Sequence, residues 1–189
     1  MNISKAGINE IKQSEGLRLK AYPDPGSKDG KPVTIGYGTT RINGNPVKMG
    51  TTITKEQAEQ YLVADLQLFA AKVDKLIKVK VTQGQFDALV SLAYNIGLDA
   101  FANSTLLRQL NAGNYKDVPT QFRRWNKNDG KVMQGLVNRR EREIKMWLGS
   151  TEKATDSPKP PTGGGSSQTK PKGLLELLIE FIKALFKRS

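Results

Sequence analysis

The chain of 189 residues contains no cysteine and no histidine. A thiol nucleophile, a Cys/His zinc site, a disulfide framework and a Ser-His-Asp triad are therefore excluded. Acid/base chemistry has to come from carboxylates, and no metal or organic cofactor is expected. The N-terminus, "MNISKAGINEIKQ", also lacks an apolar run of signal-peptide length. We expect synthesis and retention in the cytosol unless another agent releases the protein.

Acidic residues are outnumbered, with 18 Asp and Glu against 30 Lys and Arg, so the formal net charge is +12. Such an excess favours an anionic partner: nucleic acid, anionic lipid or lipopolysaccharide, or an acidic wall polymer. The basic side chains are scattered over predicted helices without an aromatic platform or a known recognition motif. Specific nucleic-acid binding is therefore not expected.

The segment 1–149 has the pattern of an α+β domain with one small antiparallel sheet. A helix is expected from the N-cap Ser4 to the stop at Gly16, and alternation with Gly- and Asn-rich turns predicts the sheet over 17–48. The remainder of the domain reads as helical. Its predicted helix starts are the capping boxes of Thr54 with Gln57 and Thr82 with Gln85, the N-caps Ser104 and Asp117, and a last helix over 134–149 after a turn at "NKNDGK".

The composition changes after the first domain. Residues 150–172 are rich in Pro, Gly and Ser and predict a linker, and residues 173–189 predict a short cationic amphipathic helix. About 22 Å of helix is too short to cross a hydrocarbon layer of about 30 Å, so it should lie in an anionic membrane surface. Docking on the first domain or self-association is the alternative. The predicted membrane-active residues are Leu174, Leu177, Leu178, Phe181, Ile182 and Leu185, with Lys183 and Lys187 on the polar stripe.

Two carboxylates in "SEGLRLKAYPDPG" are candidates for catalysis. Glu15 falls in the last turn of the first predicted helix, where the partial negative charge of the helix end disfavours ionisation. Asp24 stands between two prolines in a turn, where water keeps it ionised. An acid and an ionised carboxylate with different surroundings are what glycoside hydrolysis requires. Thr34 is a third candidate, because its hydroxyl can hold an attacking water, although a β-branched residue in a strand is the simpler interpretation.

Three separated motifs carry a resemblance: "EGLRLKAYPD", "TIGYGT" and "GLVNRREREIKMW". Together they resemble the phage-type lysozyme family, over roughly residues 1–149. The resemblance implies a two-lobe domain, with a sheet lobe and a helical lobe joined by a long helix. It also implies cleavage of the β-1,4 bond between N-acetylmuramic acid and N-acetylglucosamine in peptidoglycan. The resemblance favours an inverting reaction, in which Asp24 activates a water molecule. Glu15 would be the general acid, and Thr34 would support the water.

The resemblance extends to weaker site candidates. Tyr94, Asn95 and Ser104 match positions along the sugar groove, and Arg139 matches a basic residue that approaches the acid. A core tyrosine and a solvated arginine are the alternatives for Tyr94 and Arg139. Trp125 and Trp147 are interpreted as core residues. The chain departs from the family pattern at Thr39, where many members carry a histidine regarded as structural.

Two classes of function remain open at the level of sequence. The first is a peptidoglycan hydrolase that acts as a monomer and carries a membrane-perturbing helix. A linker followed by such a helix is also typical of an engineered fusion, in this case an antibacterial protein applied from outside the cell. The second is a non-catalytic wall- or membrane-binding protein on a lysozyme scaffold. Lysis by a Glu15→Gln variant separates them, because a binding protein is indifferent to that change.

Overall fold

The computed structural model describes residues 1–23 and 29–149. Asp24, the linker predicted at 150–172 and the helix predicted at 173–189 lie outside the described residues. The described part has the α+β class expected from the sequence. In chain order its elements are α1 (Lys5–Glu15), β1 (Arg18–Pro23), β2 (Val33–Gly36), β3 (Arg41–Ile42), β4 (Asn45–Pro46), α2 (Lys55–Leu76), α3 (Gln83–Ile96), α4 (Leu98–Ala102), α5 (Thr105–Asn111), a 3₁₀ turn η1 (Tyr115–Asp117), α6 (Val118–Arg123), β5 (Lys127–Asn128), β6 (Lys131–Val132) and α7 (Gln134–Gly149).

The helix starts follow the predicted caps. The Ser4 side chain accepts hydrogen bonds from two backbone N–H groups at the start of α1. Both capping boxes are present, with the Thr54 and Thr82 side chains accepting from the backbone three residues on. Asp117 precedes α6, but its side chain makes no cap hydrogen bond there. The predicted caps of α1, α2 and α3 are therefore confirmed, whereas the predicted cap hydrogen bond of Asp117 is absent.

The strands form separate pairs, whereas the sequence predicted a single sheet over 17–48. β1 pairs antiparallel with β2, and β3 pairs with β4. Gly36 and Gly38 adopt φ values of +67° and +101°, so the chain turns out of the strand conformation between the two pairs. The predicted turn "NKNDGK" is a hairpin of β5 and β6, in which Asp129 and Gly130 both have positive φ.

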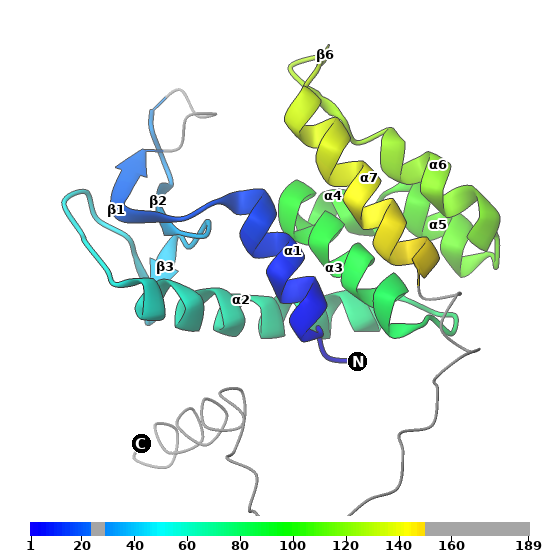
Figure 1. The fold of residues 1–189 in the computed structure, drawn as a ribbon, viewed down its shortest axis with the longest axis horizontal. Coiled ribbons are helices and arrows are strands. Elements are labelled where there is room, and N and C mark those ends of the chain that lie inside the picture. Colours follow the sequence, from blue (N-terminus) through cyan, green and yellow to red (C-terminus); the bar gives the residue numbers. More distant parts are fainter. Residues whose placement is uncertain (24–28, 150–189) are drawn as a thin grey trace, which may run out of the picture. The chain divides into compact units, whose positions relative to one another are not determined.

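The core is built around α3. Every residue from 85 to 93 is buried, and the helix contacts α1, α2, α4 and α7. In Figure 1, β1 to β3 gather at one end of the domain and the later helices at the other, while α2 runs past both. This confirms the two lobes and the long connecting helix. The lobes leave a groove at the C-terminal end of α1, where the candidate acid lies.

Candidate active site

Glu15 is the last residue of α1. Gly16 follows it with a φ of +71°, and its N–H donates to the carbonyl of Lys12, which ends the helix. The Glu15 side chain is 22% exposed, and its Oε1 lies 2.7 Å from an Nη of Arg139 on α7. The contact between Glu15 and a basic residue of the last helix, expected from the resemblance, is therefore present.

Arg139 is held in place by buried partners. Its side chain is only 4% exposed. Its Nε donates to Oε1 of Glu143 at 3.2 Å, and its second Nη donates to the backbone carbonyl of Ser91 at 3.1 Å. The Ser91 hydroxyl also donates to Oε1 of Glu143, at 2.7 Å. The guanidinium that touches Glu15 is thus fixed by α3 as well as by its own helix.

Arg140 completes this arrangement, which we call the Glu143 cluster (Ser91, Arg139, Arg140 and Glu143). Arg140 donates from an Nη to Oε1 of Glu143 at 2.9 Å, and its Nε lies 2.7 Å from Oε2. Burial raises the pKa of Glu143 and lowers the pKa of Arg140, while their mutual attraction opposes both effects. The carboxylate lies between two guanidinium groups, whose positive charges favour its ionised form. Nothing in the sequence singles out Glu143 for this role.

A groove on the sheet-lobe side of Glu15, here the small-lobe groove, has a volume of about 570 Å³. Thr34 on β2 lines it together with Glu15, so the structure brings two of the predicted catalytic residues to one groove. Thr34 is 8% exposed, and its hydroxyl donates a long 3.4 Å hydrogen bond to the carbonyl of Pro32. The lining residues are Glu15, Tyr22, Pro32, Thr34, Gly38, Thr40, Arg41, Asp65, Phe69, Tyr94 and Asn95.

A second groove, here the helical-lobe groove, has a volume of about 660 Å³. Glu15 and Asn95 line both grooves, so the acid stands at their junction. A chain-like substrate lying along the two grooves would pass Glu15 near its middle. The lining residues are Ser14, Glu15, Asn95, Ile96, Trp125, Lys127, Asn128, Met133, Gly135, Leu136, Arg139 and Arg142.

Tyr94 and Gly38 shape the contact surface beside the acid. The Tyr94 hydroxyl donates to the carbonyl of Tyr37 at 3.2 Å, and burial raises the pKa of the phenol, with the charges of Asp65 and Glu15 adding to the effect. A Cβ on Gly38 would lie 3.5 Å from the Tyr94 hydroxyl and 3.9 Å from Oε2 of Glu15. With its φ of +101°, Gly38 is the residue that lets this turn of "TIGYG" pass close to the acid.

Ser104 is the N-cap of α5, as predicted, whereas Trp125 is only in part the core residue that the sequence indicated. Ser104 is 5% exposed, and its hydroxyl accepts from the N–H of Leu107 as the N-cap of α5. It lines neither groove, so a saccharide contact there stays a prediction. Trp147 is a core residue and is 3% exposed. Trp125 is only partly buried: it packs against the core and also lines the helical-lobe groove.

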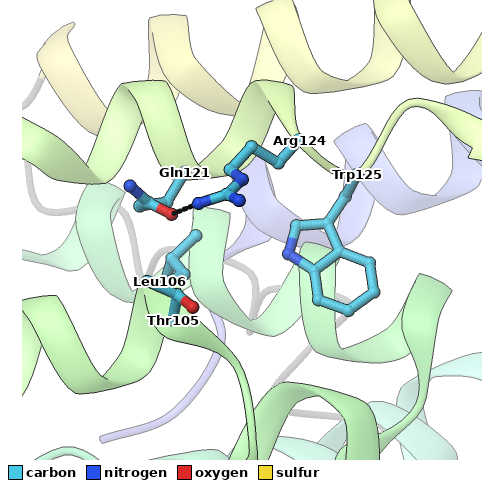
Figure 2. A pocket seen from close by; sticks show the side chains of 5 residues that line it. All are labelled: Thr105, Leu106, Gln121, Arg124 and Trp125. Atoms are coloured by element: carbon cyan, nitrogen blue, oxygen red, sulfur yellow. Dashed lines mark hydrogen bonds between the residues drawn. The ribbon is translucent and has the colours of Figure 1, made fainter.

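A further hollow of about 220 Å³ is also lined by Trp125. Figure 2 shows its lining of Thr105, Leu106, Gln121, Arg124 and Trp125, with Arg124 donating to the Gln121 amide oxygen. No carboxylate is among these residues. Because acid/base hydrolysis needs a group that gives up a proton, this hollow is not the catalytic centre.

Asp65 is a carboxylate of the small-lobe groove that sequence analysis did not select. It lies on α2, half-buried, and the Thr39 hydroxyl donates to its Oδ2 at 3.1 Å. Thr39, which departs from the family pattern, therefore still links the sheet lobe to the long helix, through a hydrogen bond from its neutral hydroxyl. Burial raises the pKa of Asp65, and the Thr39 hydrogen bond opposes this in part.

The raised pKa of Asp65 predicts how stability depends on pH. Asp65 binds its proton more tightly in the folded protein than in the unfolded chain, where aspartates titrate at about pH 4. Ionisation of Asp65 above that pH therefore reduces the free energy of unfolding. We expect Asp65→Asn to gain stability relative to the parent between pH 4 and pH 7. Urea unfolding at several pH values measures this difference. A difference that stays constant or shrinks with rising pH would contradict the expectation.

The two lobes, with a carboxylic acid at the groove between them, define a lysozyme-like hydrolase, and solved structures are similar to it. The endolysin from Escherichia coli O157:H7 phage FAHEc1 has a TM-score of 0.71 and 49% identity, covering 79% of this chain and 95% of that one. The muramidase domain of SpmX from Asticaccaulis excentricus has a TM-score of 0.70 and 36% identity, covering 78% of this chain and 97% of that one. The phage lysozyme family model matches residues 12–143, and the chain belongs to that family.

A curated relative matches nearly the whole chain. The endolysin of Bacillus phage B103 is 48% identical over 187 residues, covering 98% of this chain. The chain spans about two thirds of the length of the Bacillus phage endolysins that it matches, 68% for phage B103 and 63% for phage PZA.

Proposed function

We propose that this protein is a muramidase that cleaves the β-1,4 bond between N-acetylmuramic acid and N-acetylglucosamine. Membership of the phage lysozyme family supports the broader function, hydrolysis of peptidoglycan that leads to bacterial lysis. The observation that carries the finer proposal is the place of Glu15, at the junction of two grooves that together accommodate a glycan chain on both sides of an acid.

In the proposed reaction, Glu15 gives a proton to the glycosidic oxygen, and Asp24 activates the attacking water. Thr34 holds that water through its hydroxyl. Two observations support these roles. Thr34 lines the small-lobe groove with Glu15, and β1 ends at Pro23, which pairs with Val33 beside Thr34, while Asp24 is the next residue in the sequence.

The test of the function is the release of new reducing ends from purified peptidoglycan. A hydrolase of the glycan strand creates one reducing end for each bond that it cleaves. A wall-binding protein on the same scaffold would bind the sacculus and release none. The outcome therefore decides between the two classes that the sequence leaves open.

The stereochemistry of the product is a separate prediction. If Asp24 activates water directly, hydrolysis takes place in one displacement, and the new reducing end first appears as the α anomer. NMR of the earliest product, recorded before mutarotation, measures this ratio. An initial β anomer would show retention and would assign a nucleophile, in place of a base, to the second carboxylate.

Tyr94, Asn95 and Arg139 are proposed to act near the saccharide. Tyr94 and Asn95 line the small-lobe groove, and Asn95 lines the helical-lobe groove as well. Arg139 contacts Glu15 and also lines the helical-lobe groove, so it positions the acid. Ser104 is retained as a saccharide contact on the family resemblance alone.

For residues 173–189, we propose binding to an anionic membrane or lipopolysaccharide surface, supported by the sequence pattern of a broad apolar face with Lys183 and Lys187. Among residues 1–23 and 29–149, none of the helices is long and apolar enough to span a bilayer. A chain ending at Gly149 should keep its activity on purified wall and lose activity on intact Gram-negative cells. Equal killing of intact cells by both chains would remove the segment from the mechanism.

We also propose that the protein acts as a monomer, is made in the host cytoplasm and reaches the wall after release. The names of its endolysin relatives support action on the wall.

A further inference from the structure

Asp65 lines the small-lobe groove. It is on α2 (Lys55–Leu76), one helical turn before Phe69, and both side chains line the groove on the same face of the helix. Glu15, Thr34 and Tyr94 line the same groove. Asp65 is therefore a second carboxylate facing the space where the sheet-lobe half of a glycan would lie.

No cation pairs with Asp65 within the part of the chain that the structure describes. Arg41 lines the same groove but directs an Nη to the carbonyl of Gly44, at 2.7 Å. Thr39 donates to Oδ2 of Asp65, and no donor from the described residues contacts Oδ1. One oxygen is thus fixed by the fold, while the other has acceptor capacity left for a ligand.

This arrangement is unfavourable for the fold alone. A half-buried carboxylate without a cation loses hydration that one hydrogen bond from a hydroxyl only partly replaces, which is why its pKa is raised. An asparagine would keep the hydrogen bond with Thr39 without a charge. The charge at this position is therefore better explained by something that enters the groove than by packing.

We propose that Asp65 is a substrate-binding residue whose Oδ1 accepts a hydrogen bond from a hydroxyl or N-acetyl N–H of the sugar in the small-lobe groove. The Thr39 hydroxyl orients the carboxylate through Oδ2. Phe69 and Tyr94, whose rings meet edge to face with centroids 5.1 Å apart, supply an apolar wall for the sugar ring. This inference depends on the proposed muramidase function, because it takes the glycan to be the ligand of the groove.

The test uses the full chain carrying Glu15→Gln, so that ligands bind without turnover. Calorimetry compares its affinity with that of the Glu15→Gln, Asp65→Asn double variant for an N-acetylglucosamine oligosaccharide and for a soluble peptide-bearing peptidoglycan fragment. We expect Asp65→Asn to weaken both about tenfold, because Thr39 donates to the amide oxygen and leaves an NH₂ donor facing the sugar donor. Asp74→Asn, on the same helix but outside both grooves, is the matched control and should leave both affinities unchanged.

Steady-state kinetics of Asp65→Asn with Glu15 intact provide a second measurement. A binding role raises KM about tenfold and changes kcat little. Unchanged affinity and KM would overturn the inference. A loss of affinity confined to the peptide-bearing fragment would also overturn it, because the hydrogen-bond donor to Asp65 would then belong to the stem peptide and not to the sugar. A collapse of kcat at unchanged affinity would overturn it in favour of proton transfer. Full activity of Glu15→Gln would instead overturn the proposed muramidase mechanism.

Discussion

Glu15→Gln is expected to lower kcat for peptidoglycan hydrolysis by a factor of about 10²–10⁴ with little change in stability. The amide oxygen of glutamine can still accept from Arg139, so the side chain keeps its place beside α7. It has no carboxylic proton to give to the leaving oxygen, which is why the loss should appear in kcat. The rate of reducing-end release from purified wall measures the effect, and thermal unfolding verifies the fold.

Glu10→Gln is a matched control for this experiment. Glu10 lies on the same helix, and its Oε1 accepts from Nε of Arg142 on α7 at 2.9 Å. The two glutamates thus share a helix and a type of partner, but Glu10 lines neither groove. We expect less than about a twofold change in kcat for Glu10→Gln, on the principle that only a group at the reacting bond contributes to proton transfer. Equal losses in the two variants would point to disturbance of the α1–α7 contact instead of lost acid catalysis.

Glu143→Gln should have the largest effect on stability. Glu143 is fully buried between the guanidinium groups of Arg139 and Arg140. Removing its charge leaves two buried cations without their shared carboxylate, and the new amide NH₂ group meets guanidinium donors. Breaking a buried ion pair in this way reduces the free energy of unfolding by about 3–5 kcal/mol. Urea unfolding at pH 7 measures the loss.

Glu141→Gln, on the same helix, is the control for an exposed ion pair. Glu141 accepts two hydrogen bonds from Arg123, but the two side chains are 49% and 54% exposed. Such a pair contributes no more than about 1 kcal/mol. A loss from Glu143→Gln no larger than that from Glu141→Gln would show that the Glu143 cluster is not the electrostatic core that its contacts indicate.

Much of the fold was predictable because local chemistry determines it. Ser4, Thr54 and Thr82 act as helix caps in the sequence and in the structure, and Gly16 ends α1 directly after the acid. The position of Glu15 at a helix end needs only these local signals. The separate β1–β2 and β3–β4 pairs were not predictable in the same way, since the departure from a single sheet depends on positive φ at glycines that also occur in ordinary turns.

The side chains missed by sequence analysis depend on contacts distant in the chain. Glu143 meets Ser91, 52 positions away, and nothing in "NRRERE" distinguishes it from Glu141, which is exposed. Asp65 reads as one polar residue of an amphipathic helix, and its contact with Thr39 spans 26 positions. Trp125 borders the helical-lobe groove because the β5–β6 hairpin follows it. The Asp-Gly pair at 129–130 was the available signal for that hairpin.

The most direct test of the proposed function identifies the new ends made in purified peptidoglycan. The digest is reduced with borohydride and its fragments are analysed by mass spectrometry, with Glu15→Gln treated in parallel. We expect reduced N-acetylmuramic acid at the new ends made by the parent protein and almost none with the variant. Reduced N-acetylglucosamine at those ends, or cleavage confined to the peptide stems, would contradict the assignment of Glu15 as the acid of a muramidase.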